Sequence, residues 1–164
     1  MAALNIGFEN DGLIEQLITA TGGRANLVAI SCNAILKGLD TGSRVITATD
    51  LNRGLADPDL REALGGWGQL GGDAPAGRLD QAIVYAMVDH DGLSRGELMD
   101  RLDALGLAFQ PEPLQQSLLR LDLAFILGEQ DGRFSYRVPL FRDMIRGLEP
   151  ERSLQRLVGD GASG

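Results

Sequence analysis

Few residues in this chain could carry nucleophilic or metal chemistry. His90 is the only histidine and Cys32 is the only cysteine. A Ser-His-Asp or Cys-His site could be assembled only around His90, and a structural zinc ion needs about four Cys, His or carboxylate ligands. His90 stands between Asp89 and Asp91 at the expected end of a helix, where the helix dipole favours a cation. We therefore predict no catalytic residue and no metal site, with His90 on the surface and Cys32 acting as a small hydrophobe.

The sequence motifs for calcium binding and for nucleotide phosphate binding are also absent. The acids Asp89, Asp91, Asp100 and Asp103 fall in no D-x-[DN]-x-[DN]-G calcium loop, so we expect them to be solvated. The phosphate-binding motif G-x-x-x-x-G-K-[ST] does not occur, and the single lysine, Lys37, follows no glycine-rich loop. Without that loop nothing cradles the β and γ phosphates. We expect that this chain does not hydrolyse ATP by itself and is not an enzyme.

The composition predicts one domain or two small ones. The chain has 164 residues, of which 44% are hydrophobic and only 5% aromatic, so aliphatic side chains must fill any core. It has no apolar run of about 18 residues, which a membrane-spanning helix needs, and its N-terminus lacks the pattern of a secretory signal. A single cysteine suits a reducing cytoplasm. The net charge of −8 makes a polyanionic partner less expected.

The first half of the chain shows the apolar spacing of helices. Leu13 and Leu17 are four residues apart, and Gly22-Gly23 is expected to end that helix. A second helix is predicted over residues 25–37. It is apolar on nearly all sides, so we expect it to be buried.

A third helix has a start signal in the sequence. Thr47 and Asp50 have the spacing of a capping box, with Asp in place of the usual Glu or Gln. Pro58 is expected to interrupt this helix, and a short segment, residues 60–64, continues beyond it. We assign residues 1–66 to a helical subdomain.

A glycine-rich stretch, residues 67–77, separates the two halves. Glycine and proline break regular structure, so we predict a linker there. Residues 78–148 contain three successive helical patterns, and Ser94 with Glu97 forms a capping box at the start of the second. The polar tail, residues 149–164, is expected to be flexible.

A predicted β-hairpin follows the third of these helices. Two apolar-aromatic runs in residues 124–141 flank Asp131-Gly132, a dipeptide typical of the type I′ turn. Phe134 and Tyr136 alternate with polar residues, as in a half-buried strand. Three helices followed by a hairpin is the order of a winged-helix domain. We therefore predict a mainly α fold with a small β-hairpin, in which a helical subdomain precedes a winged helix.

Three segments together resemble parts of a known family. The run Thr21-Gly-Gly-Arg-Ala-Asn-Leu-Val28 begins one predicted helix, and Val45-Ile-Thr-Ala-Thr-Asp-Leu begins another. These runs resemble helix starts in the lid that follows the nucleotide-binding core of AAA+ and STAND ATPases. Residues 78–148, as far as Phe134-Ser-Tyr-Arg-Val-Pro-Leu-Phe141, resemble the winged helix that follows such lids. The resemblance covers roughly residues 10–148, and the order and spacing of the motifs carry it.

This resemblance implies a non-catalytic C-terminal regulatory or protein-interaction module of a P-loop ATPase. Because the phosphate loop is missing, the chain would be a fragment of a larger ATPase or a descendant that lost its motor. ATP and Mg²⁺ would bind to the parent protein, with no cofactor in this chain. Arg24 would correspond to a sensor-2 arginine that reaches the nucleotide. The implied partners are the ATPase's own core or neighbouring subunits, for which an exposed Trp67 would be an anchor.

The alternative is a DNA-binding winged helix of a transcriptional regulator or a replication-type ATPase. Its recognition helix would be the third helix of the second half. There we expect Gln115, Gln116, Ser117 and Arg120 on the exposed face. Gln and Arg side chains can read base edges in a major groove.

The hairpin and the helix after it carry the most basic part of the sequence. This basic patch consists of Arg133, Arg137, Arg142 and Arg146. A wing can use such arginines to contact phosphates. Alternatively they pair with nearby acids, for which we expect Glu129, Asp131 and Asp143. The acidic balance of the chain favours a protein partner over duplex DNA.

Overall fold

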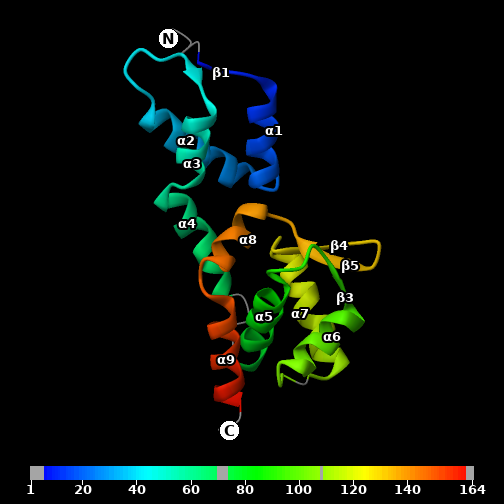
Figure 1. Cartoon of the computed structure of the whole chain (residues 1–164). Helices are drawn as coiled ribbons and strands as arrows, with labels where there is room; N and C mark the ends of the chain where they lie inside the picture. Colours follow the sequence, from blue (N-terminus) through cyan, green and yellow to red (C-terminus); the bar gives the residue numbers. More distant parts are fainter. Residues whose placement is uncertain (1–5, 70–73, 108, 162–164) are drawn as a thin grey trace. The chain divides into compact units, whose positions relative to one another are not determined.

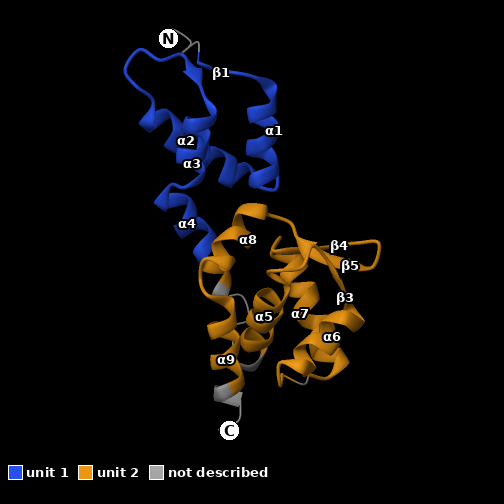
Figure 2. Cartoon of the chain, in the orientation of Figure 1, with its two compact units in different colours: residues 1–65 blue, residues 66–164 orange. Residues whose placement is uncertain are grey.

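The computed structural model describes residues 6–69, 74–107 and 109–161. The chain forms two compact units, residues 1–65 and residues 66–164 (Figure 2). Helices make up most of both units and strands are few and short (Figure 1), which confirms the predicted mainly α fold class.

The first unit is a group of helices with one short pair of strands. The two strands are parallel, with Gly7 opposite Val45 and Phe8 opposite Ile46. Its elements in chain order are β1 (Gly7–Phe8), α1 (Asp11–Ala20), α2 (Ala25–Gly38), β2 (Val45–Ile46), α3 (Ala48–Leu55) and α4 (Pro58–Gly65).

Polar side chains cap the starts of α1 and α3. Asn10 caps α1 by accepting from the backbone N–H of Leu13. Thr47 and Asp50 form the predicted capping box at the start of α3, in which each side chain accepts from the other residue's backbone N–H. The helix breaks before Pro58 as expected, so α3 and α4 are separate.

The core of the first unit is aliphatic and joins residues far apart in the sequence. One cluster of it consists of Leu13, Leu17, Ile35, Ile46 and Leu51, and Leu27, Ala34, Leu60 and Leu64 are also buried. The prediction that the second helix is buried on nearly all sides is wrong, because α2 leaves Leu36 45% exposed.

The second unit is built around helix α5. Its three strands form an antiparallel sheet in the order β3-β5-β4. Its elements in chain order are the 3₁₀ helix η1 (Gly66–Gln69), α5 (Ala74–Met87), β3 (Leu93–Ser94), α6 (Arg95–Ala104), α7 (Pro111–Leu123), β4 (Leu127–Gln130), β5 (Arg133–Tyr136), α8 (Pro139–Arg146) and α9 (Pro150–Gly161).

Helix α5 lies at the centre of this unit, and α6, α7 and α9 contact it (Figure 1). Ala82, Ile83, Ala86 and Met87 of α5 are fully buried. Leucines spaced at helical intervals on α6 and α7 supply the opposing surface: Leu98, Leu102, Leu114, Leu118 and Leu121. Within each helix these buried leucines are three or four residues apart, the spacing of an amphipathic helix.

The hairpin turn has the predicted geometry. Asp131 and Gly132 have φ angles of 52° and 74°, and a type I′ turn requires positive φ at both central residues. Strands β4 and β5 pair from Leu127 opposite Tyr136 to Gln130 opposite Arg133. The third strand of the sheet, β3, was not part of the prediction.

Two predictions about irregular segments are wrong. The tail expected to be flexible contains helix α9, which contacts α5 and buries Ser153 and Leu154. The expected linker over residues 67–77 is largely helical where it is described, because η1 extends to Gln69 and α5 begins at Ala74. The remaining linker residues, 70–73, lie outside the described residues.

Trp67 is part of the second unit's aromatic cluster. Its ring packs edge-on against Tyr85 and Phe141, with centroid separations of 5.8 and 5.4 Å. The side chain is half-buried. It is therefore engaged in the fold and is not the fully exposed anchor that a partner would require.

The close packing of α2 and α3 yields a stability prediction. A Cβ at Gly54 would lie 2.4 Å from Ile35 Cγ1 and 3.1 Å from the Ser31 carbonyl oxygen. We expect Gly54→Ala to destabilise the first unit by about 1–2 kcal/mol, because overpacking outweighs the roughly 1 kcal/mol that alanine contributes to a helix. Hydrogen exchange of the α2 and α3 amides should accelerate accordingly.

The matched control for this variant is Gly96→Ala in α6, where a Cβ would meet no atom within 4 Å. That substitution should leave exchange unchanged or slow it in the second unit. Unchanged exchange in Gly54→Ala would contradict the packing described for this contact.

Candidate partner-binding groove

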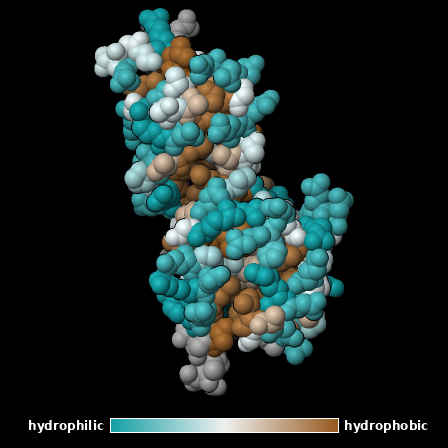
Figure 3. Space-filling model, viewed as in Figure 1, coloured by the Kyte–Doolittle hydropathy of each residue, from teal (hydrophilic) through white to brown (hydrophobic). Residues whose placement is uncertain are grey.

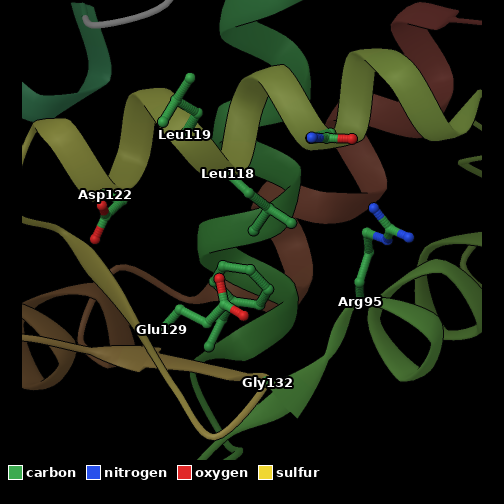
Figure 4. Close-up of a pocket in the computed structure, with 8 residues that line it drawn as sticks. Arg95, Leu118, Leu119, Asp122, Glu129 and Gly132 are labelled. Atoms are coloured by element: carbon green, nitrogen blue, oxygen red, sulfur yellow. The ribbon is translucent and has the colours of Figure 1, made fainter.

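A groove of about 430 Å³ lies between helix α7 and the β4–β5 hairpin (Figure 4). It lies between the helix and the hairpin that were predicted as a recognition helix and its wing, and of the predicted contact residues its described lining includes Gln115. Its lining residues are Arg95, Gln115, Leu118, Leu119, Asp122, Glu129, Gly132 and Phe134. Both apolar and charged side chains therefore form this surface.

Helix α7 presents exposed leucines beside the groove. Its first turn begins with Pro111, where the absent N–H has no intrahelical partner to lose. One face buries Leu114, Leu118 and Leu121 against the unit. On the other side, Leu119 is 58% exposed and Leu123 is 74% exposed. A helix used only for folding would place polar residues at those positions.

The loop after α7 extends this apolar surface. Phe125 is 47% exposed and has a φ of 61°, a left-handed conformation that non-glycine residues rarely adopt. The Arg137 guanidinium carbon lies 4.6 Å from the centre of the Phe125 ring. This cation–π contact holds an aromatic side chain at the surface.

The charges of the groove are separated. In Figure 4, Asp122 and Glu129 lie on one side of the view and Arg95 on the other, with Leu118 and Leu119 along the helix between Asp122 and Arg95. Asp122 forms an ion pair with Arg137. Among the residues that the structure describes, neither Arg95 nor Glu129 has an ion-pair partner, and both are exposed.

The structure places the predicted residues of the recognition helix in different environments. Gln115 and Gln116 are exposed as predicted, and Gln115 lines the groove. Ser117 is fully buried, so its predicted exposure is wrong. Arg120 is also wrongly predicted as an exposed reader, because it is half-buried in an ion pair with Asp80 of α5.

The Arg120–Asp80 pair joins α7 to the central helix. Arg120 donates from Nε and Nη2 to the two Asp80 carboxylate oxygens at 3.1 and 2.8 Å, and from Nη2 to the Ser117 hydroxyl at 2.7 Å. The Asp80 side chain is only 4% exposed. The bidentate geometry satisfies a buried carboxylate, which gives Arg120 a structural role.

The two arginines of the hairpin are paired with acids. Arg133 contacts Glu97 at 3.1 Å and donates to the Gly92 carbonyl at 3.0 Å. Arg137 pairs with Asp122 and donates to the Leu127 carbonyl at 2.9 Å. Hydrogen bonds from Ser94, together with Arg133, lower the pKa of Glu97. Both arginines therefore contribute to the fold.

Helix α8 directs its two arginines to the C-terminal end of α5. Arg142 donates to the Val88 carbonyl and to Asp91, both at 2.7 Å. Arg146 donates to the same carbonyl at 3.2 Å and lies 3.5 Å from Asp89. The hydrogen bond from Arg142 and its charge lower the pKa of the Asp91 carboxyl.

Every arginine of the predicted basic patch thus has an acidic partner. The alternative that these arginines pair with acids is correct, but two of the three acids expected as partners are not their partners. Of Glu129, Asp131 and Asp143, only Asp143 forms such a pair, with Arg146 at 3.3 Å. Sequence reasoning missed the actual partners of Arg133, Arg137 and Arg142 because these acids lie 15 to 51 residues away in the chain.

The exposed leucines were also missed. Leu119 and Leu123 differ by four residues, the same spacing as the core leucines of the helix. The sequence does contain a signal for them, because leucines fall on more than one face of this helix. An amphipathic helix that packs on one core needs only one apolar stripe.

The other candidate residues lie outside this groove. Arg24 occupies the N-cap of α2 in the first unit and is half-buried. Cys32 packs against the aliphatic core of that unit, and burial raises the pKa of its thiol. Within the described ranges, no three His, Cys, Asp or Glu side chains are grouped as a metal ion would require.

Comparison of the chain with protein-family models, with curated proteins and with solved structures finds no match. Over the part of the chain that the structure describes, no helix combines the length and apolarity needed to cross a membrane. In the view of Figure 3, hydrophilic residues cover most of the visible face of the second unit, with hydrophobic residues in smaller patches.

The structural role of Arg120 can be tested by unfolding. Arg120→Ala would leave the buried Asp80 carboxylate without its partner. Breaking a fully buried pair costs about 3–5 kcal/mol, and since Arg120 is one-third exposed we expect roughly 2–3 kcal/mol. Urea unfolding of the second unit, followed by Trp67 fluorescence, measures this loss.

Arg95→Ala is the control, because Arg95 is exposed and lacks an ion-pair partner among the described residues. Its urea midpoint should stay within the roughly ±0.5 kcal/mol typical of surface changes. Equal stability of Arg120→Ala and Arg95→Ala would contradict the structural role of Arg120.

Proposed function

We propose that this chain is a non-catalytic protein-interaction module, and that its second unit is a winged helix that contacts protein through the α7–hairpin groove. The element order α5, β3, α6, α7, β4 and β5 supports the winged-helix assignment. One observation carries the functional proposal. The surface where a winged helix would read DNA exposes Leu119 and Leu123, while its neighbouring arginines are neutralised by acids.

Apolar exposure favours a protein partner. Leu119, Leu123 and Phe125 follow one another along α7 and the loop after it, and each is about half exposed or more. Apolar side chains gathered on a surface indicate an interaction site. These apolar side chains do not contribute to phosphate binding, because the affinity of a protein for the DNA backbone is electrostatic.

Duplex DNA remains the second candidate, and specific residues support it. Gln115 and Gln116 are exposed on α7, and Arg95 lines the same groove. Arginine and glutamine pair well with base edges. However, the groove also contains Asp122 and Glu129, and these carboxylates repel phosphates. In addition, each of the four arginines of the basic patch already forms an ion pair with an acidic side chain.

The regulatory part of the proposal concerns the first unit. Its resemblance to an ATPase lid suggests a place beside the nucleotide-binding core of a P-loop ATPase, which would supply ATP and Mg²⁺. Arg24 stands at the N-cap of α2, which is a suitable position for a side chain that approaches a neighbouring phosphate. In this arrangement the second unit recruits or positions a partner protein.

The DNA alternative is tested by fluorescence anisotropy with a labelled duplex in about 50 and 200 mM salt. We expect no saturable binding at either salt concentration, because few cations on the groove lack acidic partners. Tight binding that weakens steeply with salt would contradict the proposal. The double variant Arg133→Ala/Arg137→Ala then shows whether the wing carries that binding.

The protein-contact proposal is tested by photo-crosslinking in cells that produce the chain. A photoreactive residue replacing Leu119 should yield discrete protein adducts. The control position is Gln155 of α9, which is exposed and lies outside the groove. Equal adducts from both positions, or none from position 119, would contradict a specific contact at the groove.

A further inference from the structure

The apolar residues beside the groove form a continuous surface. Leu119 lines the groove itself, and Leu123 follows it one helical turn later on α7. Both side chains are more than half exposed. A partner that covers Leu119 must therefore also face the charged residues on the two sides of the groove.

The charged residues restrict what that partner can be. Arg95 lies on one side of the groove, at the start of α6, and Glu129 lies on the hairpin. Both are exposed and lack ion-pair partners among the described residues, whereas Asp122 is paired with Arg137. The complementary surface must present an acid toward Arg95, a base toward Glu129 and apolar side chains toward Leu119.

The groove itself presents the charges that such a partner must present, a base on one side (Arg95) and an acid on the other (Glu129). A two-fold rotation exchanges the two sides of a surface, so that residue i of one copy meets residue j of the other, and j meets i. Applied here, the rotation places Arg95 of each copy opposite Glu129 of its partner. It also covers Leu119 of each copy with the partner's groove, because Leu119 lines this surface.

We propose that the groove binds a second copy of this chain, forming a two-fold symmetric dimer through α7 and the hairpin. This inference rests on the proposed function, in that it takes the groove to bind protein. The net charge of −8 on each copy opposes association at long range. At physiological ionic strength the Debye length is about 8 Å, so that this repulsion is largely screened while the short-range contacts persist.

Sedimentation of the full chain over a range of concentrations in about 0.15 M salt tests the proposal. The wild-type chain should pass from monomer to dimer as its concentration rises. Leu119→Asp should weaken self-association at least about 30-fold, because the lost burial occurs once in each copy. The control is Leu148→Asp, at a leucine that is 51% exposed but outside the groove, and it should dimerise like the wild type.

Charge-reversal variants test whether Arg95 of one copy faces Glu129 of the other in the dimer. Arg95→Glu and Glu129→Arg should each be monomeric, since each places like charges opposite one another twice. An equimolar mixture of the two variants should dimerise, because both cross-pairs again join opposite charges. Circular dichroism of each variant separates loss of association from loss of folding, and recovery in the mixture shows that both chains are folded.

The outcomes separate this inference from the function on which it rests. A wild-type chain that stays monomeric at every concentration overturns the dimer, as does a dimer that tolerates Leu119→Asp or a mixture that fails to associate. A monomeric chain that crosslinks to a different protein at position 119 still supports the proposed function. Duplex DNA binding that is lost on Leu119→Asp, in a chain that stays monomeric at every concentration, overturns both.

Discussion

The C-terminal end of helix α5 is the constraint on which the second unit depends. The last carbonyls of a helix have no intrahelical partner, and the helix dipole concentrates negative charge there. In this chain side chains from other elements supply the donors. Arg101 of α6 donates to the Ala86 carbonyl at 2.7 Å, and both Arg142 and Arg146 of α8 donate to Val88. The Tyr136 hydroxyl donates to the Val84 carbonyl at 2.5 Å, and burial raises its pKa well above the usual range.

These contacts explain why α8 does not form a basic surface, and the ion pairs of Arg133 with Glu97 and of Arg137 with Asp122 do the same for the hairpin. An arginine that satisfies a buried carbonyl and an acid at once has little capacity left for phosphate. The same α5 helix holds Asp80, which fixes Arg120 of α7. Consequently Arg120, Arg142 and Arg146 join α7 and α8 to the central helix or its end, while Arg133 and Arg137 pair with Glu97 and Asp122. Besides Gln115 and Gln116, α7 leaves Leu119 and Leu123 exposed, and these leucines are the reason that we propose a protein partner.

The sequence predicts best those features that depend on neighbouring residues. The capping boxes at Thr47 and Ser94 and the positive φ angles at Asp131-Gly132 are set within four residues, so their spacing suffices to predict them. The helix break at Pro58 is equally local.

Features that depend on distant residues were not predictable in the same way. Strand β1 pairs with β2 almost 40 residues later, and two-residue strands have no alternation to detect. Helix α9 is polar along most of its surface, and its contact with α5 stabilises it. The sequence pointed to residues of α7 and the hairpin, but the groove between them was not predicted, and the roles of Arg120, Arg133 and Arg137 depend on partners that lie 15 to 40 residues away.

The central claim is that the α7–hairpin groove contacts protein and not DNA. The most direct measurement is a map of amide chemical shifts in the isotope-labelled chain, recorded as duplex DNA is added and, separately, as the chain itself is concentrated. The account predicts that DNA leaves the amides of Leu119, Leu123 and Glu129 unshifted, while rising protein concentration shifts them. Shifts at these amides that follow the DNA concentration, with none that follow the protein concentration, would contradict it.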